Sequence, residues 1–334
     1  MISQAEVIQT LVQLGESFHK QNDALNAAIA RTYVENNWLT KENYWLALNN
    51  WKTQLQEENL KQFCNDYTYT DAPKSVGIIM AGNIPMVGFH DLMCVLLSGN
   101  IAIVKPSSDD KYVMEYVVEF LQKTNLANRV MKVERLENID AVIATGSNNS
   151  FKYFEHYFKH IPRLLRKNRK SIAVLDGTET AADLNLLAQD VFQYFGLGCR
   201  NVCFLYLPKS LEVTTVLDAF MPLKDIVNHN RYANNYTYHR AMLLMNSEQH
   251  LDTGFVLPKE RLDMNVPLAC LHYYYYQDQA EVDAFIKNNE ENLQCVVGNY
   301  WAKDTIPYGK AQNPELQDFA DRVDTMIFLQ DLRS

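Results

Sequence analysis

The sequence lacks the features that define several large classes of protein. Its formal net charge is −9, which argues against the basic face that nucleic-acid binders need. No segment approaches the roughly 18–20 unbroken apolar residues of a membrane span, so no such span is predicted. The N-terminus has no basic start followed by an apolar block, and it does not resemble a secretory signal. These absences favour a globular protein of the cytoplasm.

Cysteine and metal chemistry are also restricted by what is missing. The six cysteines form no CxxC pair for zinc or redox work, and a chain without a secretory signal is expected to keep them as reduced thiols. His156 and His160 have the spacing of helix-borne zinc ligands, but the glutamate of H-E-x-x-H is missing, so no metal site is predicted. The chain contains no G-x-S-x-G elbow and no Walker lysine loop.

What the sequence does contain is a regular alternation of apolar strands and helices. Residues 1 to about 68 favour two or three helices, and from Ser75 short buried strands such as "SVGIIMAG" and "AVIATGS" are separated by helical segments. The pattern resumes after Pro208, and Tyr273–Tyr276 of a later strand would alternate between its two faces. We predict an α/β fold with mostly parallel sheets. Its two units would meet near residue 195, with a ligand cleft at their junction.

The stretch "FGLGCRNVCFLYLP" holds two of the cysteines. Cys199 follows a glycine pair at a turn between a helix and a strand, where a thiol would be exposed and able to act as a thiolate nucleophile. Cys203 lies inside the apolar run and is interpreted as a small core residue. The segment before this stretch is predicted as an amphipathic helix with Thr178 or Thr180 as its N-cap.

Polar residues follow the ends of the predicted strands. Asn83 comes after the first strand, where its amide could donate to an oxyanion or simply precede a helix. Lys105 ends the second strand, where it could meet a phosphate or ribose or remain solvated. Gly146 and Ser147 precede a helix and form a usable phosphate cradle. The basic run "RLLRKNRK" is either a solvated helix end or a contact for coenzyme phosphates.

The order of these motifs resembles a known superfamily. "GNIP", "LLSGNIAIVKPS", "ATGS" and a cysteine after a glycine pair resemble the aldehyde dehydrogenases and, within them, the acyl-CoA reductases related to the fatty-acid reductase of bacterial luminescence. The resemblance implies an aldehyde-dehydrogenase-like fold with two Rossmann-like domains. The implied segments are a helical N-terminus at 1–70 packed on the coenzyme domain, a coenzyme domain at 71–195, a catalytic domain at 196–304, and a C-terminal return to the coenzyme domain at 305–334.

The resemblance also implies roles for the residues at the motif positions. Cys199 would take the acyl group as a thioester, and Asn83 with the Cys199 backbone N–H would form the oxyanion hole. No carboxylate in "RKNRKSIAVLDG" matches the water-activating glutamate of hydrolytic aldehyde dehydrogenases, which favours reduction over oxidation. Ser108 stands where NAD-preferring members often carry a glutamate, so we expect NADPH as the cofactor, with NADH as the alternative.

The coenzyme-binding residues follow from the same motifs. Lys105 would meet the adenosine ribose, and Ser107 is placed beside it among the coenzyme contacts. Gly146 and Ser147 would lie near the pyrophosphate. The segment "RLDMNVPLACL" resembles the E-x-F-G-P segment that holds the nicotinamide ribose, which puts Asp263 at the glutamate position, one methylene shorter.

The expected reaction is the NAD(P)H-dependent reduction of a fatty acyl thioester, carried by CoA or by an acyl carrier, to an aldehyde. An acyl-activating or acyl-transferring protein is a further candidate partner. Oxidation of aldehydes, reduction of acyl phosphates, and a non-catalytic scaffold for an acyl-transferring partner are the alternatives.

Overall fold

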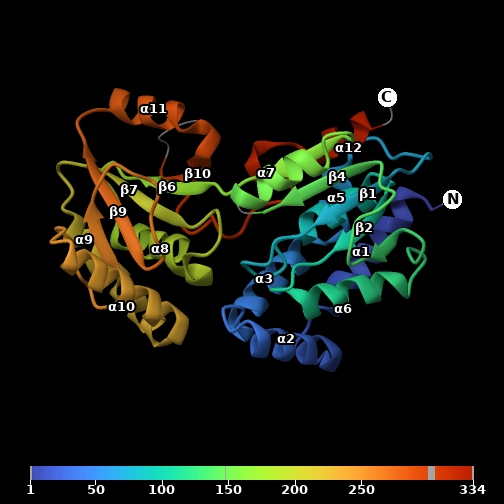
Figure 1. Cartoon of the computed structure of the whole chain (residues 1–334), viewed down its shortest axis with the longest axis horizontal. Helices are drawn as coiled ribbons and strands as arrows, with labels where there is room; N and C mark the ends of the chain where they lie inside the picture. The colour runs from blue at the N-terminus through green and yellow to red at the C-terminus, as the bar shows by residue number, and fades with distance from the viewer. Residues whose placement is uncertain (1, 147, 300–304, 333–334) are drawn as a thin grey trace. The chain divides into compact units, whose positions relative to one another are not determined.

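The computed structural model describes residues 2–146, 148–299 and 305–332, and Figure 1 shows its helices and strands along the chain. The helices of the described chain are all too short or too polar to traverse a lipid bilayer.

The chain forms two compact units. One consists of Met1–Asn168 and Glu315–Ser334, and the other of Arg169–Pro314. The division therefore lies well before the predicted boundary near residue 195, because the strand that follows residue 168 already belongs to the second sheet. The return to the first unit likewise comes ten residues later than the predicted residue 305.

The first unit combines N-terminal helices, a sheet with its covering helices, and a C-terminal helix. Its elements are α1 (Gln4–Ser17), α2 (Asp23–Glu35), α3 (Lys41–Gln54), α4 (Glu57–Cys64), β1 (Ser75–Ile79), α5 (Phe89–Leu97), β2 (Ile101–Lys105), α6 (Lys111–Gln122), β3 (Val130–Lys132), β4 (Ala141–Thr145), α7 (Asn148–Tyr157), β5 (Arg163–Arg166), η4 (Ala320–Arg322) and α12 (Thr325–Asp331).

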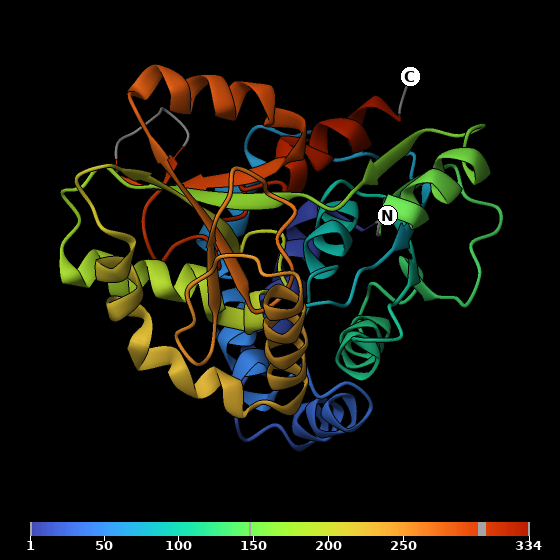
Figure 2. The ribbon, with the colours of Figure 1, turned by 60° about the vertical axis from the view of Figure 1, so that its left-hand side comes forward.

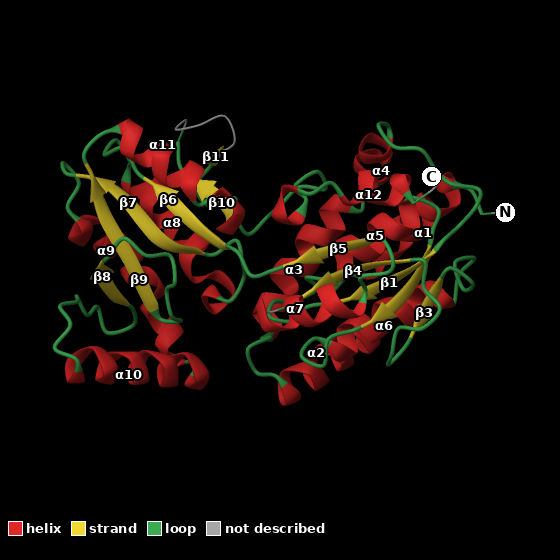
Figure 3. Ribbon diagram, turned by 45° about the horizontal axis from the view of Figure 1, so that its top comes forward, coloured by secondary structure: helices red, strands yellow, loops and turns green. Residues whose placement is uncertain are grey.

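The first sheet has the strand order β3-β2-β1-β4-β5, and its strand pairs are all parallel (Figure 3). Alternate residues of each strand enter different cores. In β2, Ala102 and Val104 pack with α1, α5 and α6, whereas Ile103 packs with the residues under α7. Because both faces of the strands are covered, their sequences are apolar throughout, as is typical of parallel sheets.

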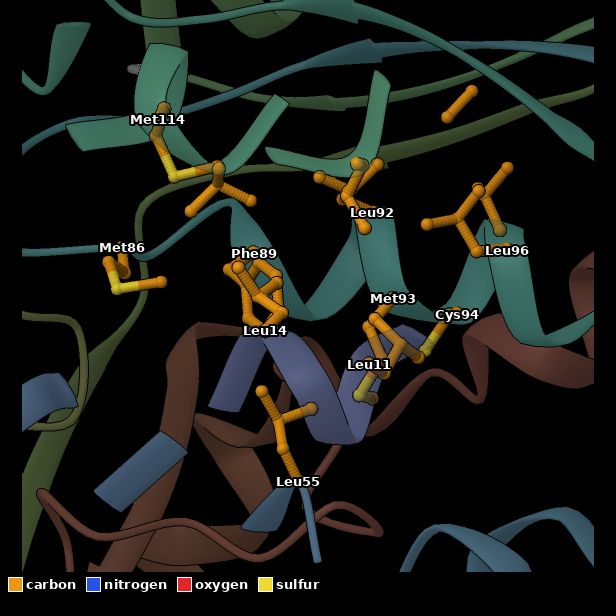
Figure 4. Packing of buried hydrophobic residues seen from close by; sticks show 14 of the residues in the cluster. Leu11, Leu14, Leu55, Met86, Phe89, Leu92, Met93, Cys94, Leu96 and Met114 are labelled. Carbon is orange, nitrogen blue, oxygen red and sulfur yellow. The ribbon is translucent and has the colours of Figure 1, made fainter. Parts of the chain in front are cut away.

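The N-terminal helices share the larger of these cores. Figure 4 shows Leu11 and Leu14 of α1 beside Phe89 and Met93 of α5, and all four side chains are fully buried. α1 begins with a capping box in which Ser3 and Glu6 bond each other's backbone N–H groups. The N-terminal segment is therefore part of the same folded unit as the first sheet.

The second unit is a sheet with helices on both faces. Its elements are β6 (Lys170–Val174), α8 (Ala181–Phe192), η1 (Gln193–Gly196), β7 (Val202–Pro208), α9 (Val213–Phe220), η2 (Met221–Asn228), α10 (Asn230–Met245), β8 (Leu257–Glu260), β9 (Cys270–Tyr276), α11 (Gln279–Asn288), η3 (Glu290–Asn292), β10 (Leu293–Val297) and β11 (Thr305–Ile306).

The second sheet has the order β11-β10-β6-β7-β9-β8 and is again parallel in each described pair. Tyr273 and Tyr275 pack with α8 and α9, whereas Tyr274 and Tyr276 pack with α11, so the predicted alternation is confirmed. Figure 2 shows α11 (orange) and α8 (yellow-green) on opposite sides of this sheet. The N-cap of α8 is Thr180, one of the two predicted candidates, and it forms a capping box with Asp183.

The basic run after α7 contains strand β5 and the first residue of β6, and it is not a helix end. α7 ends at Tyr157, and Arg166, the last residue of β5, is only 5% exposed. Its guanidinium pairs with the buried Asp91 of α5 and donates to Thr325 Oγ1 of α12 at 2.8 Å. Arg166 therefore binds neither solvent nor a coenzyme phosphate, which corrects both predictions for this residue.

Candidate functional site

The carboxyl edge of the first sheet gathers four of the predicted site residues. β1 and β2 end in register, with Ile79 opposite Lys105, and β4 ends beside β1. Lys105 stands at this edge, and Asn83, Ser107 and Gly146 follow within a few residues of the strand ends. The strand order reverses between β1 and β4, which is where doubly wound sheets bind ligands. Ser147 lies outside the described residues.

The loop that carries Asn83 lies against the loop that carries Ser107. Met80 N–H donates to the Lys105 carbonyl at 3.1 Å, and a Cβ on Gly82 would lie 2.5 Å from Ser107 Oγ. Gly82 is therefore required for this close approach. Ser107 Oγ also accepts a hydrogen bond from Asp109 N–H at 3.2 Å. The two predicted motifs thus form one continuous surface at the end of the sheet.

Asp110 lies three residues after Ser107 in the chain and was not among the predicted site residues. It is fully buried, and its carboxylate accepts hydrogen bonds from the Tyr44 hydroxyl and from Met86 N–H. Burial raises the pKa of Asp110 to about 7, against the lowering effect of these two bonds. In the second unit, burial likewise raises the pKa of Asp190 to about 6.

Because the pKa values of Asp110 and Asp190 are raised, we predict that the free energy of unfolding falls as pH rises. The ordinary pKa of each is 3.8, so the folded protein keeps both protons after the unfolded chain has lost them. The stabilisation is complete below about pH 4 and is lost as pH approaches 7. We expect wild type to lose about 2 kcal/mol between pH 5 and 8 through Asp110 alone, and Asp110→Asn to lose less. Urea unfolding at both pH values measures this, and identical slopes for the two proteins would contradict it.

The turn that carries Cys199 has an unusual backbone. Tyr194, Phe195 and Gly196 have φ values of 54°, 60° and 75°, a left-handed conformation that costs free energy for the two residues with side chains. The buried side chain of Asn201 holds the turn: its Nδ2 donates to three carbonyls of α8 and η1, and its Oδ1 accepts Gly198 N–H at 2.8 Å. Asn201 was missed from the sequence, although an asparagine in a glycine-rich turn is a known signal.

The two cysteines of this stretch differ in their surroundings. Cys199 is half-buried, and its carbonyl accepts a hydrogen bond from Ser171 Oγ at 2.8 Å. Cys203 Sγ lies 3.6 Å from the Ser171 carbonyl, and burial raises the pKa of Cys203 to about 11. A thiol with so high a pKa is almost fully protonated at neutral pH and is a poor nucleophile.

A pocket of about 170 Å³ opens near the amino ends of β7 and β9. Most of its lining residues have apolar side chains, among them Phe195, Tyr232 and Leu268, although polar atoms form more than half of its exposed surface. The thiol-bearing residues Cys203 and Cys270 also line it. Cys199 is not among its described lining residues. The volume is close to that of a cavity of about 150 Å³ known to hold benzene, so the pocket is large enough for part of an apolar ligand.

Asp263 lies in a second pocket of the same unit, of about 230 Å³. Its carboxylate accepts Asn265 N–H at 2.8 Å and lies 3.2 Å from Arg261 Nη2. The two pockets share Pro267 and Cys270 in their walls, so the segment that carries Asp263 borders both.

Comparison with known proteins shows which family this chain resembles. The acyl-CoA reductase (LuxC) family matches residues 58–216, a stretch that includes Asn83, Lys105 and Cys199. The predicted resemblance to the acyl-CoA reductases is confirmed. The match covers slightly less than half of the chain and supports an oxidoreductase that acts on acyl or aldehyde groups. No curated protein matches the chain.

Solved structures similar to this LuxC-like chain show the fold. A NAD-dependent benzaldehyde dehydrogenase from Corynebacterium glutamicum covers 91% of this chain and 77% of its own, with a TM-score of 0.67 at 12% identity. A NAD-dependent aldehyde dehydrogenase from Sinorhizobium meliloti covers 91% and 71%, with a TM-score of 0.66 at 11% identity. The NAD+ complex of an aldehyde dehydrogenase from Bacillus cereus covers 91% and 72%, with a TM-score of 0.65 at 13% identity. The predicted aldehyde-dehydrogenase-like fold is confirmed.

Proposed function

We propose that the protein reduces a fatty acyl thioester, carried by CoA or by an acyl carrier, to an aldehyde through an acyl group bound to Cys199. The observation that carries this proposal is the LuxC match, because one stretch of it includes the predicted nucleophile, the oxyanion donor and the coenzyme lysine. The pocket of about 170 Å³ in the unit of Cys199, whose lining residues mostly have apolar side chains, is consistent with an acyl substrate.

Cys199 opens the reaction. Its thiolate attacks the thioester carbonyl, a new thioester forms on Cys199, and the carrier thiol leaves. Asn83 and the Cys199 backbone N–H donate to the oxyanion of the tetrahedral intermediate. Asn201 holds the turn around Cys199 through four hydrogen bonds, so the backbone donor needs no reorganisation during the step.

The residues at the carboxyl edge of the first sheet fit a nicotinamide coenzyme. Lys105 is a half-exposed cation, and the absence of a Cβ on Gly82 keeps Ser107 close to the Asn83 loop. Ser108 carries no charge that would repel a 2′-phosphate, which favours NADPH, with NADH as the alternative. The bound coenzyme supplies the hydride that turns the enzyme thioester into the aldehyde. We assign Gly146 and Ser147 to the pyrophosphate and Asp263 to the nicotinamide ribose.

The test follows NADPH and NADH oxidation with a panel of acyl-CoAs of increasing length and with an acyl phosphate. The reverse reaction is followed as reduction of NADP+ or NAD+ by an aldehyde in the presence of CoA. We expect acyl-CoA to be reduced faster with NADPH, and intact-protein mass spectrometry to find one acyl group per chain. If acyl phosphate is reduced and acyl-CoA is not, the substrate is an acyl phosphate and not an acyl thioester. Absence of both turnover and acylation would favour the scaffold alternative.

Asn83→Ala is predicted to slow acylation by about 100-fold, because one oxyanion donor is lost. The KM for acyl-CoA should change little, since the donor acts on charge that develops only in the transition state. Rates of mass increase on wild type and variant measure the effect. A variant with an unchanged acylation rate would remove Asn83 from the oxyanion hole.

A further inference from the structure

Asp110 stands at the N-cap of α6 but does not cap the helix. Aspartate is among the favoured N-cap residues, because its side chain accepts a backbone N–H of the first turn. No such hydrogen bond forms here, and the φ and ψ angles of Asp110 are −121° and 53°. The helix therefore begins without the stabilisation that this residue normally gives it, and the carboxylate is used elsewhere.

The carboxylate instead joins two segments that are distant in the sequence. Oδ1 accepts the hydroxyl of Tyr44 in α3, and Oδ2 accepts Met86 N–H at 2.7 Å. Met86 has a left-handed backbone with a φ of 57°, which is unfavourable for a residue with a side chain and needs support from its surroundings. The Met86 side chain is 1% exposed and lies in the core, as Figure 4 shows.

Met86 is part of the loop that carries Asn83. This loop, residues 80–88, is tied to the segment 105–110 at both ends. At its start Met80 N–H binds the Lys105 carbonyl, and near its end Met86 N–H binds Asp110. Between them Gly82 packs so closely that a Cβ there would lie 2.9 Å from Asp110 N. Asp110 therefore lies close to this loop at Gly82 and is hydrogen-bonded to it at Met86.

We propose that Asp110 is a positioning residue for the Asn83 loop and that it couples this loop to the N-terminal helix α3 through Tyr44. Its buried carboxylate holds the Met86 peptide and so fixes the left-handed turn that follows Asn83. The role assigned to Asn83 rests on the proposed function, whereas the hold on the loop does not.

Amide hydrogen exchange tests the hold directly. In Asp110→Ala we expect exchange in residues 80–88 to rise about tenfold, as loss of a buried hydrogen bond implies, with the strands of the first sheet unchanged. Asp110→Asn keeps an acceptor for Met86 N–H and should restore most of the protection. Asp109→Ala, at the exposed neighbouring residue, is the control and should exchange like wild type.

Two outcomes overturn the proposal: unchanged exchange in the loop of Asp110→Ala, or an increase spread evenly over the first unit. If Asp110→Ala does not fold, Tyr44→Phe replaces it. That variant removes one of the two partners of the carboxylate and should also raise exchange in residues 80–88 more than elsewhere. Unchanged exchange there would equally overturn the proposal.

Acylation of Cys199 provides the second readout. A positioning role predicts that Asp110→Ala slows acylation at saturating acyl-CoA by about tenfold without changing the KM, and that Asp110→Asn rescues the rate. Equal acylation by wild type and Asp110→Ala would overturn the link to Asn83. If wild type itself takes up no acyl group, the proposed function has failed, and the exchange experiment still decides the role of Asp110.

Discussion

Cys199→Ser is expected to lower acyl-CoA reduction by on the order of 1000-fold or more and to abolish the mass increase caused by acyl-CoA. The thiolate is a far stronger nucleophile at neutral pH than a serine hydroxyl, and the reduction needs the covalent thioester. Serine is close to cysteine in size and shape, and the substitution keeps the Cys199 carbonyl, which accepts a hydrogen bond from Ser171 Oγ at 2.8 Å. The fold should therefore be unaffected, and thermal unfolding should show it.

Cys203→Ser is the matched control, four residues along the same stretch. Burial raises the pKa of Cys203 to about 11, so its thiol is a poor nucleophile and the variant should keep reduction within about threefold of wild type. Both variants are measured by coenzyme oxidation and by intact-protein mass. The opposite pattern, with Cys203→Ser inactive and Cys199→Ser active, would identify Cys203, which lines the pocket of about 170 Å³, as the nucleophile.

The central strands were predictable from the sequence, and the outer ones were not. β1, β2 and β4 are runs of buried apolar residues, and such runs indicate strands covered on both faces. β3, β8 and β11 have only three, four and two residues and lie at or near the sheet edges, where few positions are buried. Short edge strands of this kind carry too little periodicity to be recognised.

The boundary between the units was misplaced for a related reason. β6 has the same apolar pattern as the strands before it, and such a pattern does not indicate to which of two sheets a strand belongs. That choice depends on pairing with β7 and β10, and β10 begins more than a hundred residues later. Pairing over such a distance is not visible in local sequence.

Some residues of the candidate site were likewise predictable from the sequence, and others were not. The rule that parallel strands end at one edge was enough to bring Lys105, Asn83 and Gly146 together. Asp110 was missed because its partners, Met86 and Tyr44, lie 24 and 66 residues away. From the sequence alone, an aspartate before a helix predicts a cap, and only the fold shows its use elsewhere.

The largest effect on stability is expected from breaking the buried pair between Arg166 and Asp91. Arg166→Leu should lower the free energy of unfolding of the first unit by about 3–5 kcal/mol, because Asp91 is left as an uncompensated charge at 4% exposure. Arg166 also holds Thr325 at the start of α12, so the C-terminal helix should lose protection from hydrogen exchange first. Urea unfolding gives the free energy, and Lys132→Ala, which breaks an exposed pair with Glu115, should cost less than about 1 kcal/mol.

Replacing both Asp91 and Arg166 should lower the free energy of unfolding less than replacing Arg166 alone. Among the described residues, Asp91 Oδ1 and Arg166 Nε have no hydrogen-bond partner, so the pair does not satisfy all of its own polar atoms. Replacement of an incompletely satisfied buried pair by apolar side chains of similar size is often neutral or stabilising. The double variant Asp91→Leu, Arg166→Leu is therefore expected to be more stable than Arg166→Leu alone. A double variant less stable than the single one would mean that packing around α5 and β5, and not an unpaired charge, determines the cost.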